Sequence, residues 1–239
     1  MLRKLRDRTD ALSFQVERIV LDPGHGGFDS GAVGKNGLKE KDVTLALANG
    51  LFDKLKRKNQ FQVFSTRDDD YYVPLGERTA TANQRKADLF VSFHINAAEN
   101  RKASGSETYY CSETASNEEA ARLAAFENSV LRFDEEAAKK PGFLDIEGIL
   151  FEFERKLYWG DSKQFAHKFQ GRFGTQLELK DRGVQLANFY VLRQAKMPAL
   201  LLETGFISNP DEEELLGQER FREKIVDGAF GAILEMSGA

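Results

Sequence analysis

The chain has 239 residues, with 34 Lys and Arg against 38 Asp and Glu, a formal net charge of −4 and a pI near 5.6. This length fits one large domain or two small ones, and a hydrophobic content of 41% is enough for a sizeable core, which excludes wholesale disorder. The acidic balance argues against a dedicated nucleic-acid binder, which would need a basic face. A single cysteine, Cys111, excludes an internal disulfide and a multi-cysteine metal site, so any metal must be held by His, Asp or Glu.

The N-terminal residues carry no targeting signal that the sequence makes recognisable. Residues 1–8 are basic but lack the apolar stretch and the cleavage site of a secretory signal. No segment of the chain approaches the roughly 18 apolar residues that a membrane span requires. Residues 1–15 are therefore predicted to be an N-terminal extension, and composition alone leaves open whether the protein is cytoplasmic or exported.

Apolar strands and amphipathic helices alternate through the first half of the chain. A buried strand is predicted at 16–21, because its apolar run stops at Pro23 and Gly24. A helix is predicted from Glu40, since apolar residues recur every four positions as far as Leu55. The elements predicted next are a strand at 61–66, a helix at 75–85, and strands at 89–93 and 107–111.

The interval 112–179 breaks this alternation. Its pattern predicts helices at 118–131, 146–157 and 162–173, with the breaker Pro141-Gly142 between the first two. A short strand, or a turn and a strand, follows at 187–192, then a very apolar strand at 199–202 and one or two helices at 212–234. We therefore expect one α/β domain at 16–239 with a central mixed, largely parallel sheet flanked by helices, and an α-helical insertion at about 134–172.

Three predicted strands lead into side chains that can bind a metal or move a proton. These side chains are His25, His94 and Glu203, and Glu40 begins the helix after the His25 loop. Because the carboxyl ends of parallel strands meet at one edge of a sheet, the four side chains should converge. Two His and one Glu form a known catalytic zinc set with a fourth position open for water. Glu203 then remains free to shuttle a proton.

Each of these residues also has a purely structural interpretation. His94 could be a hydrogen-bonded core histidine, and Glu40 a helix-start carboxylate favoured by the helix dipole. His167 is expected on the polar face of a helix. Glu203 is harder to explain structurally, since a carboxylate next to an apolar strand is costly unless it is paired or coordinated. A phosphate-binding loop at 24–35 is rejected, because neither a Ser or Thr nor a helix follows Lys35.

The chain also resembles a known family at six motifs that occur in order. These are Ile19-Val20-Leu21-Asp22-Pro23-Gly24-His25-Gly26-Gly27, Gly37-Leu38-Lys39-Glu40-Lys41, Ser65-Thr66-Arg67, Leu75-Gly76-Glu77-Arg78 with Ala82-Asn83, Ala87-Asp88-Leu89-Phe90-Val91-Ser92-Phe93-His94-Ile95-Asn96 and Leu202-Glu203-Thr204-Gly205-Phe206-Ile207-Ser208-Asn209. Together they resemble the zinc-dependent N-acetylmuramoyl-L-alanine amidases of bacterial cell-wall remodelling and cell division, over most of 17–111 and 181–235.

The resemblance implies a hydrolase that uses one Zn²⁺ to cleave the peptidoglycan amide between N-acetylmuramic acid and L-alanine. By motif position, His25, Glu40 and His94 would be the zinc ligands and Glu203 the catalytic carboxylate. The family acts outside the cytoplasm, which implies an extracytoplasmic and most simply periplasmic protein whose signal is not in this chain. Two alternatives stay open: a non-catalytic peptidoglycan-binding or regulatory homologue, and a zinc peptidase acting within the stem peptide.

The resemblance further implies a role for the insertion, with two alternatives: an ordinary helical decoration, or a segment whose aromatic side chains bind a partner or a glycan. Some amidases of this family carry a helical insertion that blocks the zinc until an activator protein docks on it. A Glu of the insertion then occupies the open metal position. Glu147 is the first choice for this autoinhibitory residue, with Glu136, Glu152 and Glu154 as rivals. The expected partners are peptidoglycan and an activator, with no nucleic acid and no membrane span.

Overall fold

The computed structural model of the chain describes residues 16–134 and 146–237. These residues form six strands, seven α-helices and one 3-10 helix. In chain order the elements are β1 (Arg18–Pro23), α2 (Glu40–Lys56), β2 (Gln62–Ser65), α3 (Leu75–Gln84), β3 (Leu89–Asn96), β4 (Ser106–Cys111), α4 (Glu118–Asn128), η1 (Ser129–Phe133), α5 (Ile146–Gln176), β5 (Asp181–Ala187), α6 (Tyr190–Arg193), β6 (Ala199–Phe206), α7 (Pro210–Gly217) and α8 (Glu219–Ser237).

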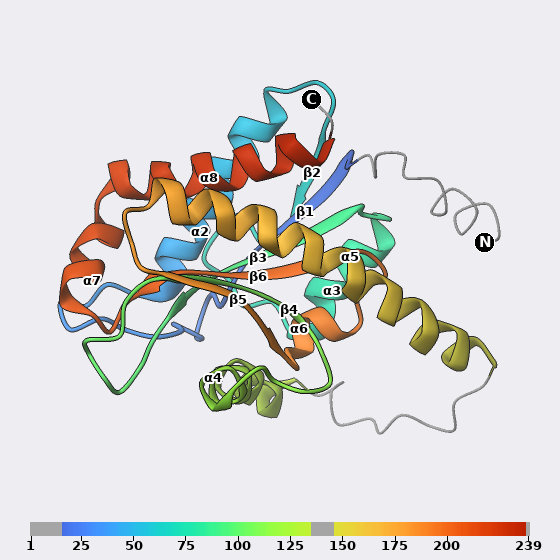
Figure 1. Cartoon of the computed structure of the whole chain (residues 1–239), viewed down its shortest axis with the longest axis horizontal. Coiled ribbons are helices and arrows are strands. Elements are labelled where there is room, and N and C mark those ends of the chain that lie inside the picture. Colours follow the sequence, from blue (N-terminus) through green and yellow to red (C-terminus); the bar gives the residue numbers. More distant parts are fainter. Residues whose placement is uncertain (1–15, 135–145, 238–239) are drawn as a thin grey trace.

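One sheet contains these strands in the order β2-β1-β3-β6-β4-β5 (Figure 1). β1 pairs in parallel with β2 and with β3, β3 in parallel with β6, and β4 in parallel with β5. Only the pair of β4 and β6 is antiparallel among the strands described. The predicted fold class, an α/β domain with a mixed and largely parallel sheet, is confirmed. The central strands β3 and β6 are buried along their whole length, as expected when helices cover both faces.

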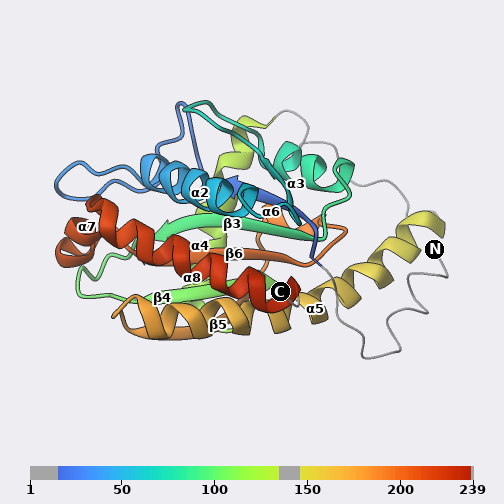
Figure 2. The same cartoon turned by 90° about the horizontal axis from the view of Figure 1, so that it is seen from above.

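The two faces of the sheet carry different helices. α2, α5 and α8 cover one face, where Leu47 of α2, Phe169 of α5 and Ile225 of α8 share a core. α3, α4 and α6 cover the other face, with Leu123 of α4 and Leu192 of α6 in a second core. Figure 2 shows that the N-terminal part of α5 extends beyond the sheet, and the C-terminal part packs on the core through Phe165, Phe169 and Phe173.

Two predictions about secondary structure are wrong. Residues 187–192 do not form a strand, because β5 ends at Ala187 and the apolar residues that follow form a turn and the short helix α6. β5 itself is an edge strand of half-buried, mostly polar residues, which gives a weak apolar signal. The two helices predicted at 146–157 and 162–173 are one continuous helix, α5. Gly160 is accommodated inside it, with open space where a Cβ would point.

The topology brings three strand ends to one edge of the sheet. β1, β3 and β6 are parallel neighbours, and His94 on β3 is paired in register with Glu203 on β6. His25 lies two residues beyond the end of β1 at Pro23. None of the described helices is both long enough and apolar enough to cross a membrane. The edge where these strands end is therefore the place to look for a site.

Candidate metal centre

His25 lies in a tight loop after β1. Its backbone is left-handed, with φ at 60°, a conformation that costs a residue with a Cβ about 1–2 kcal/mol and persists only where the surroundings fix it. Two buried arginines do so: Arg78 donates to the carbonyl of His25 at 2.8 Å, and Arg67 to that of Gly24 at 2.8 Å. Asp29 Oδ2 lies 2.9 Å from the imidazole Nδ1. If Nδ1–H donates to this carboxylate, Nε2 keeps a free lone pair.

A buried charge network ties this loop to the sheet. Arg78 Nη1 donates to Asp22 Oδ1 at 2.9 Å, and the Thr66 hydroxyl donates to the same oxygen at 2.5 Å. The other oxygen of Asp22 accepts from the Ser92 hydroxyl at 2.7 Å. Burial alone would raise the pKa of Asp22, but Arg78 and the two hydroxyls outweigh it and hold the pKa below its usual range. The base of the loop is thus a satisfied, fixed ion pair.

Glu40 is the first residue of α2, and only 1% of its surface is exposed. Its Oε2 accepts from the backbone N–H of Ala32 at 2.8 Å, and its Oε1 from that of Ile95 at 2.9 Å. Gly31 makes room for this arrangement, because a Cβ there would lie 2.6 Å from Oε2. Two backbone amides therefore fix the orientation of the carboxylate.

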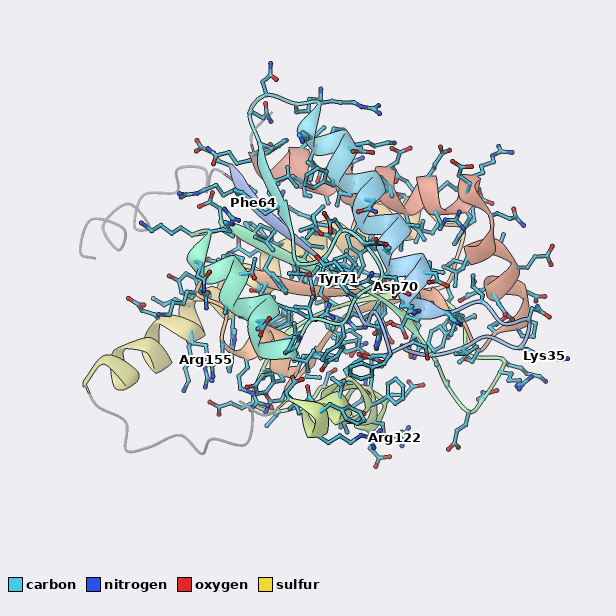
Figure 3. All side chains as sticks on the ribbon, turned by 180° about the vertical axis from the view of Figure 1, so that it is seen from behind. Lys35, Phe64, Asp70, Tyr71, Arg122 and Arg155 are labelled. Atoms are coloured by element: carbon cyan, nitrogen blue, oxygen red, sulfur yellow. The ribbon has the colours of Figure 1, made fainter. Side chains whose placement is uncertain are left out.

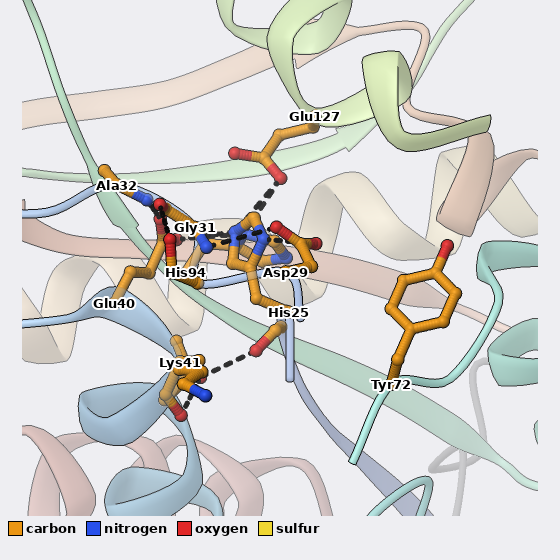
Figure 4. A network of polar contacts seen from close by, with 12 residues as sticks. His25, Asp29, Gly31, Ala32, Glu40, Lys41, Tyr72, His94 and Glu127 are labelled. Carbon is orange, nitrogen blue, oxygen red and sulfur yellow. Dashed lines mark hydrogen bonds and ion pairs between the residues drawn. The ribbon is translucent and has the colours of Figure 1, made fainter. Parts of the chain in front are cut away.

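Four side chains converge beyond the sheet edge (Figure 4). Nε2 of His25 lies 3.1 Å from Glu40 Oε1 and 3.4 Å from Glu127 Oε2. Nδ1 of His94 lies 3.2 Å from each of the same two oxygens. The four ligand atoms are all within 4.8 Å of one another. Ligands of a tetrahedral zinc with bonds of about 2.0–2.1 Å stand about 3.3 Å apart, so these separations are those of a zinc-sized site.

The chemistry of this set also fits a cation. Nε2 of His25 and Nδ1 of His94 are buried, and neither has a hydrogen-bond partner among the described residues. Burial acts to lower the pKa of His25, but Glu40 and Glu127 outweigh it and raise the pKa to about 10. The same balance raises the pKa of His94 well above its usual range. Two carboxylates and two imidazoles placed this close together are stabilised by a positive charge between them. One divalent cation can provide that charge and bind all four side chains.

Glu203 lies beside this set without joining it. It is 1% exposed, and neither carboxylate oxygen has a hydrogen-bond partner in the described part of the chain. Burial raises its pKa, the charges of Glu40, Glu127 and Glu107 raise it further, and His94 offsets this only in part. The pKa of Glu203 therefore lies well above its usual range. A carboxyl group that is free of hydrogen bonds can exchange a proton with whatever binds next to the cation.

The structure places the residues predicted from the sequence as follows. It brings His25, Glu40 and His94 together, with Glu203 on the adjacent strand. His167 is exposed on α5, in agreement with its structural interpretation. Residue Glu154 is partly exposed on α5 and is not part of the set.

The predicted regulatory residue Glu147 cannot be compared with this site. Its side chain lies outside the described residues, as do those of the rivals Glu136 and Glu152.

Glu127, the fourth member of the set, was missed by the sequence analysis. It lies in α4, before the predicted insertion at 134–172, and enters the site from the side opposite α2 (Figure 4). One signal could have found it: Ala120, Leu123, Ala124 and Glu127 follow the i, i+3, i+4, i+7 spacing of one buried helix face. A carboxylate on a face otherwise made of small apolar residues needs a buried partner.

Comparison with known proteins gives concordant results. A protein-family profile described as N-acetylmuramoyl-L-alanine amidase matches residues 19–235. The chain is 38% identical over 210 residues to N-acetylmuramoyl-L-alanine amidase AmiA of Escherichia coli K12, covering 87% of this chain and 71% of that one. It is 35% identical over 216 residues to AmiC of E. coli O6:H1, covering 90% of this chain but only 51% of that one. The chain therefore spans about half the length of that relative.

The solved structures give a similar picture. The crystal structure of an N-acetylmuramoyl-L-alanine amidase from Clostridium difficile 630 superposes with a TM-score of 0.70 and 29% sequence identity. The match covers 92% of this chain and 96% of that one.

Proposed function

Because the chain belongs to the N-acetylmuramoyl-L-alanine amidase family, we propose that it hydrolyses the peptidoglycan amide between the lactyl group of N-acetylmuramic acid and L-alanine of the stem peptide. The observation that carries this proposal is the convergence of His25, Glu40 and His94 at a zinc-sized site next to Glu203. Two imidazoles, one carboxylate and an adjacent carboxyl group suit metal-assisted hydrolysis of an amide.

We assign His25, Glu40 and His94 as the ligands of one zinc ion. The ion would supply a Lewis acid for the scissile carbonyl and would lower the pKa of a bound water to near 7. Asp29 fixes the tautomer of His25, and the amides of Ala32 and Ile95 fix the carboxylate of Glu40. These contacts hold the ligands in place before substrate binds.

Glu203 is the proton carrier in this proposal. Its carboxylate accepts a proton from the attacking water and donates a proton to the alanine nitrogen as the C–N bond breaks. Its two oxygens have no competing hydrogen bond among the described residues, which leaves them available for both transfers. Glu203→Gln should therefore abolish turnover while zinc still binds.

The proposal includes autoinhibition, but by α4, the helix that precedes the predicted insertion. Glu127 Oε2 lies 3.4 Å from His25 Nε2 and 3.2 Å from His94 Nδ1, so it would take the fourth ligand position of a zinc ion held by His25, Glu40 and His94. A water could not take that position while Glu127 holds it. We therefore assign to Glu127 the blocking role that the sequence analysis gave to the insertion, and we propose that the chain rests in a closed state.

An activator protein would open the site by drawing α4 away. The N-terminal part of α5 extends beyond the sheet and follows the blocking segment in the chain, so it is the surface we propose for docking (Figure 2). An extracytoplasmic, periplasmic location and a role in cell division belong to the same proposal, since peptidoglycan lies outside the cytoplasm.

Product analysis on purified peptidoglycan tests the proposal. The full chain and Glu127→Ala are incubated with peptidoglycan, and the released peptides are sequenced from the N-terminus. We expect Glu127→Ala to release stem peptides with a free N-terminal L-alanine, faster than the full chain does. Glu118→Ala is a matched control, because this exposed carboxylate on the same helix is paired, among the described residues, with Arg122 alone, at 3.6 Å.

Other outcomes would favour the alternatives. Peptides that begin within the stem would identify a zinc peptidase. Zinc binding without any release, from a folded Glu127→Ala protein, would identify a non-catalytic peptidoglycan-binding homologue. Equal release by the full chain and Glu127→Ala would keep the amidase and reject the autoinhibition.

A further inference from the structure

Exposed aromatic rings stand beside the metal centre. Phe28, three residues after His25, is 66% exposed, and Phe133 at the end of η1 is 55% exposed. The ring centroid of Phe28 lies 4.4 Å from that of Tyr72, with the ring planes tilted by 36°, and 5.5 Å from that of Phe133. Apolar surface gathered in this way on a soluble domain marks a binding site more often than a single exposed residue does.

The turn that carries Phe28 is fixed relative to the metal ligands. Gly26 and Asp29 exchange two backbone hydrogen bonds, of 2.8 and 3.1 Å, and Phe28 lies between them. Asp29 of the same turn contacts the His25 imidazole. The Phe28 ring is therefore presented by the same rigid turn that orients a zinc ligand.

A second set of contacts pins this turn to the loop after β2. The N–H of Gly27 donates to Asp70 Oδ1 at 2.8 Å, and its carbonyl accepts from Lys41 Nζ at 2.8 Å. A Cβ on Gly27 would lie 2.7 Å from the backbone nitrogen of Tyr72, so the two loops touch. Figure 3 shows Asp70 and Tyr71 next to each other on this loop, and Tyr71 is itself 45% exposed. The backbone that carries the exposed aromatic rings is therefore held in place by hydrogen bonds.

The opposite side of the metal centre has a different character. Phe28 and Tyr72 follow β1 and β2, whereas a cavity of about 500 Å³ lies toward β4 and β6, beneath α4. Half of the residues that line this cavity are polar or charged: Asn96, Glu99, Asn100, Glu107, Glu119 and Arg122. The other half are apolar or aromatic, among them Tyr109, Leu123, Phe126 and Phe206. Such a mixed lining suits a peptide, whose backbone is polar and whose side chains vary, whereas the exposed faces of Phe28 and Tyr72 suit the C–H face of a pyranose ring.

We propose that Phe28 and Tyr72 form a carbohydrate subsite, on which a pyranose ring of the glycan strand stacks while the stem peptide extends toward the cavity beneath α4. This inference rests on the proposed amidase function and adds the direction in which the substrate crosses the site. The C–H groups of the sugar face carry partial positive charge and meet the negative face of the aromatic ring.

In the closed chain, the segment from α4 to Asp134 covers this subsite in part. Phe133 lies edge-on to Phe28, with ring planes at 75°, and the carboxylate of Asp134 accepts from the Tyr72 hydroxyl at 2.5 Å. Phe28 remains 66% exposed in this arrangement, so packing against Phe133 does not explain where the Phe28 ring lies. One segment would therefore cover the sugar subsite with Phe133 and the metal with Glu127.

The test compares soluble substrates that share one stem peptide and carry one, two or four sugars. All variants are made in Glu127→Ala, which removes the block. In that background we expect KM to fall as sugars are added. Phe28→Ala should raise KM for the four-sugar substrate about 3- to 10-fold and remove most of the dependence on length, with kcat within about twofold and the zinc content unchanged. Phe28→Leu, which keeps apolar volume but lacks an aromatic face, should behave like Phe28→Ala.

Three results would overturn the inference. They are an unchanged length dependence in Phe28→Ala, a parental KM in Phe28→Leu, and a loss of zinc together with a fall in kcat on the one-sugar substrate. The last result would assign Phe28 to support of the His25 loop. Phe133→Ala is the companion variant, and it should keep the full length dependence because it only uncovers the subsite.

Failure of the proposed function can be told apart from failure of this inference. If Glu127→Ala cleaves none of the substrates, the amidase proposal fails, and binding is measured with peptide-free glycan strands as the probe. Binding by Glu127→Ala that is weakened about 3- to 10-fold by Phe28→Ala would still support the sugar subsite. No binding of these strands by Glu127→Ala would reject it.

Discussion

α2 and α4 each bring one carboxylate to the metal centre, but they are attached to the domain in different ways. α2, which carries Glu40, buries four large apolar side chains: Val43, Leu47, Leu51 and Leu55. α4, which carries Glu127, buries one large side chain and two small ones: Leu123, Ala120 and Ala124. Since burial of a large apolar side chain stabilises by about 1.5–3 kcal/mol, α4 is held to the sheet far less firmly than α2.

The polar contacts, like the apolar ones, hold α4 less firmly than α2. Glu40 is bound by backbone amides in the interior of the domain. α4 is held near its two ends by side chains, with Glu119 paired to Arg182 at 2.9 Å and Asn128 bonded to the loop before α6. The comparison supports the proposal that the three ligands expected from the sequence are permanent parts of the site and that Glu127 is a removable one. The predictions below test this difference.

The largest contrast should come from removing one ligand of each kind. His94→Ala should lose zinc and lower the amidase rate by at least about 10³-fold, because the metal is worth several kcal/mol of transition-state stabilisation. Glu127→Ala should keep one zinc per chain and release peptide faster than the parent. Metal content after dialysis and peptide release together check both. Loss of zinc from Glu127→Ala would make all four residues permanent ligands and remove the distinction.

A similar contrast is expected between the ion pair that anchors the His25 loop and the ion pair that anchors α4. Arg78→Met leaves the buried carboxylate of Asp22 without its cation, and should lower the free energy of unfolding by about 3–5 kcal/mol. Glu119→Ala removes one of the carboxylates that hold α4, and this carboxylate is 57% exposed. The variant should therefore change the free energy of unfolding by less than about 1 kcal/mol. Urea unfolding at neutral pH measures both.

The pH dependence of Arg78→Met gives a second check. In the parent, the folded-state pKa of Asp22 lies below its usual range, so the stabilisation is complete at neutral pH and is lost as the pH falls through that lowered pKa. In the variant, burial favours a protonated Asp22, which acid supplies. The difference in unfolding free energy between parent and variant should therefore shrink toward acid pH. A difference independent of pH would show that Arg78 acts through packing alone.

A smaller effect is expected one contact away from the metal. Asp29→Asn keeps an oxygen for the N–H of Gly31, which Asp29 Oδ1 accepts at 3.1 Å, but removes the charge facing His25 Nδ1. Zinc affinity should fall about tenfold, at the low end of what loss of such a supporting contact costs. Competition with a chelator measures it, and Asp68→Asn on an exposed loop is the matched control. Equal affinities in parent and Asp29→Asn would assign the orientation of His25 to its backbone alone.

The permanent part of the site could be predicted from the sequence, and the removable part could not. His94 and Glu203 lie near the carboxyl ends of apolar strands and His25 lies two residues beyond one, so local pattern and the parallel sheet together specify where they meet. Glu127 is far from them in sequence, and its place depends on how α4 docks against the opposite face. No local pattern specifies that docking, because few apolar side chains on α4 encode it.

The errors in secondary structure have the same origin. β5 is an edge strand whose residues are half buried, so its sequence does not alternate clearly, while the apolar residues that follow it pack from a turn and α6. A break was expected between the helices at 146–157 and 162–173, but α5 continues through Gly160 as one long helix whose C-terminal part packs on the sheet. In both cases tertiary packing overrides the local preference.

The smallest effect should come from loosening the α4 anchor. Asn128 Nδ2 donates to the carbonyl of Asn188 at 2.9 Å, and its Oδ1 accepts from the N–H of Tyr190 at 2.8 Å. Asn128→Ala removes both bonds at a net cost of about 1 kcal/mol to the closed state, which is about fivefold in the equilibrium between closed and open chains. Peptide release by the otherwise full-length chain should rise by about that factor.

Glu118→Ala on the same helix should leave the rate of peptide release unchanged, since among the described residues its carboxylate pairs with the neighbouring Arg122 alone. Adding Asn128→Ala to Glu127→Ala should produce no further rise, because a chain without the blocking carboxylate gains nothing from a looser helix. A further rise in that double variant would mean that α4 hinders the substrate by its bulk as well as through Glu127. Asn128 would then control access to the cavity beneath α4 in addition to the metal.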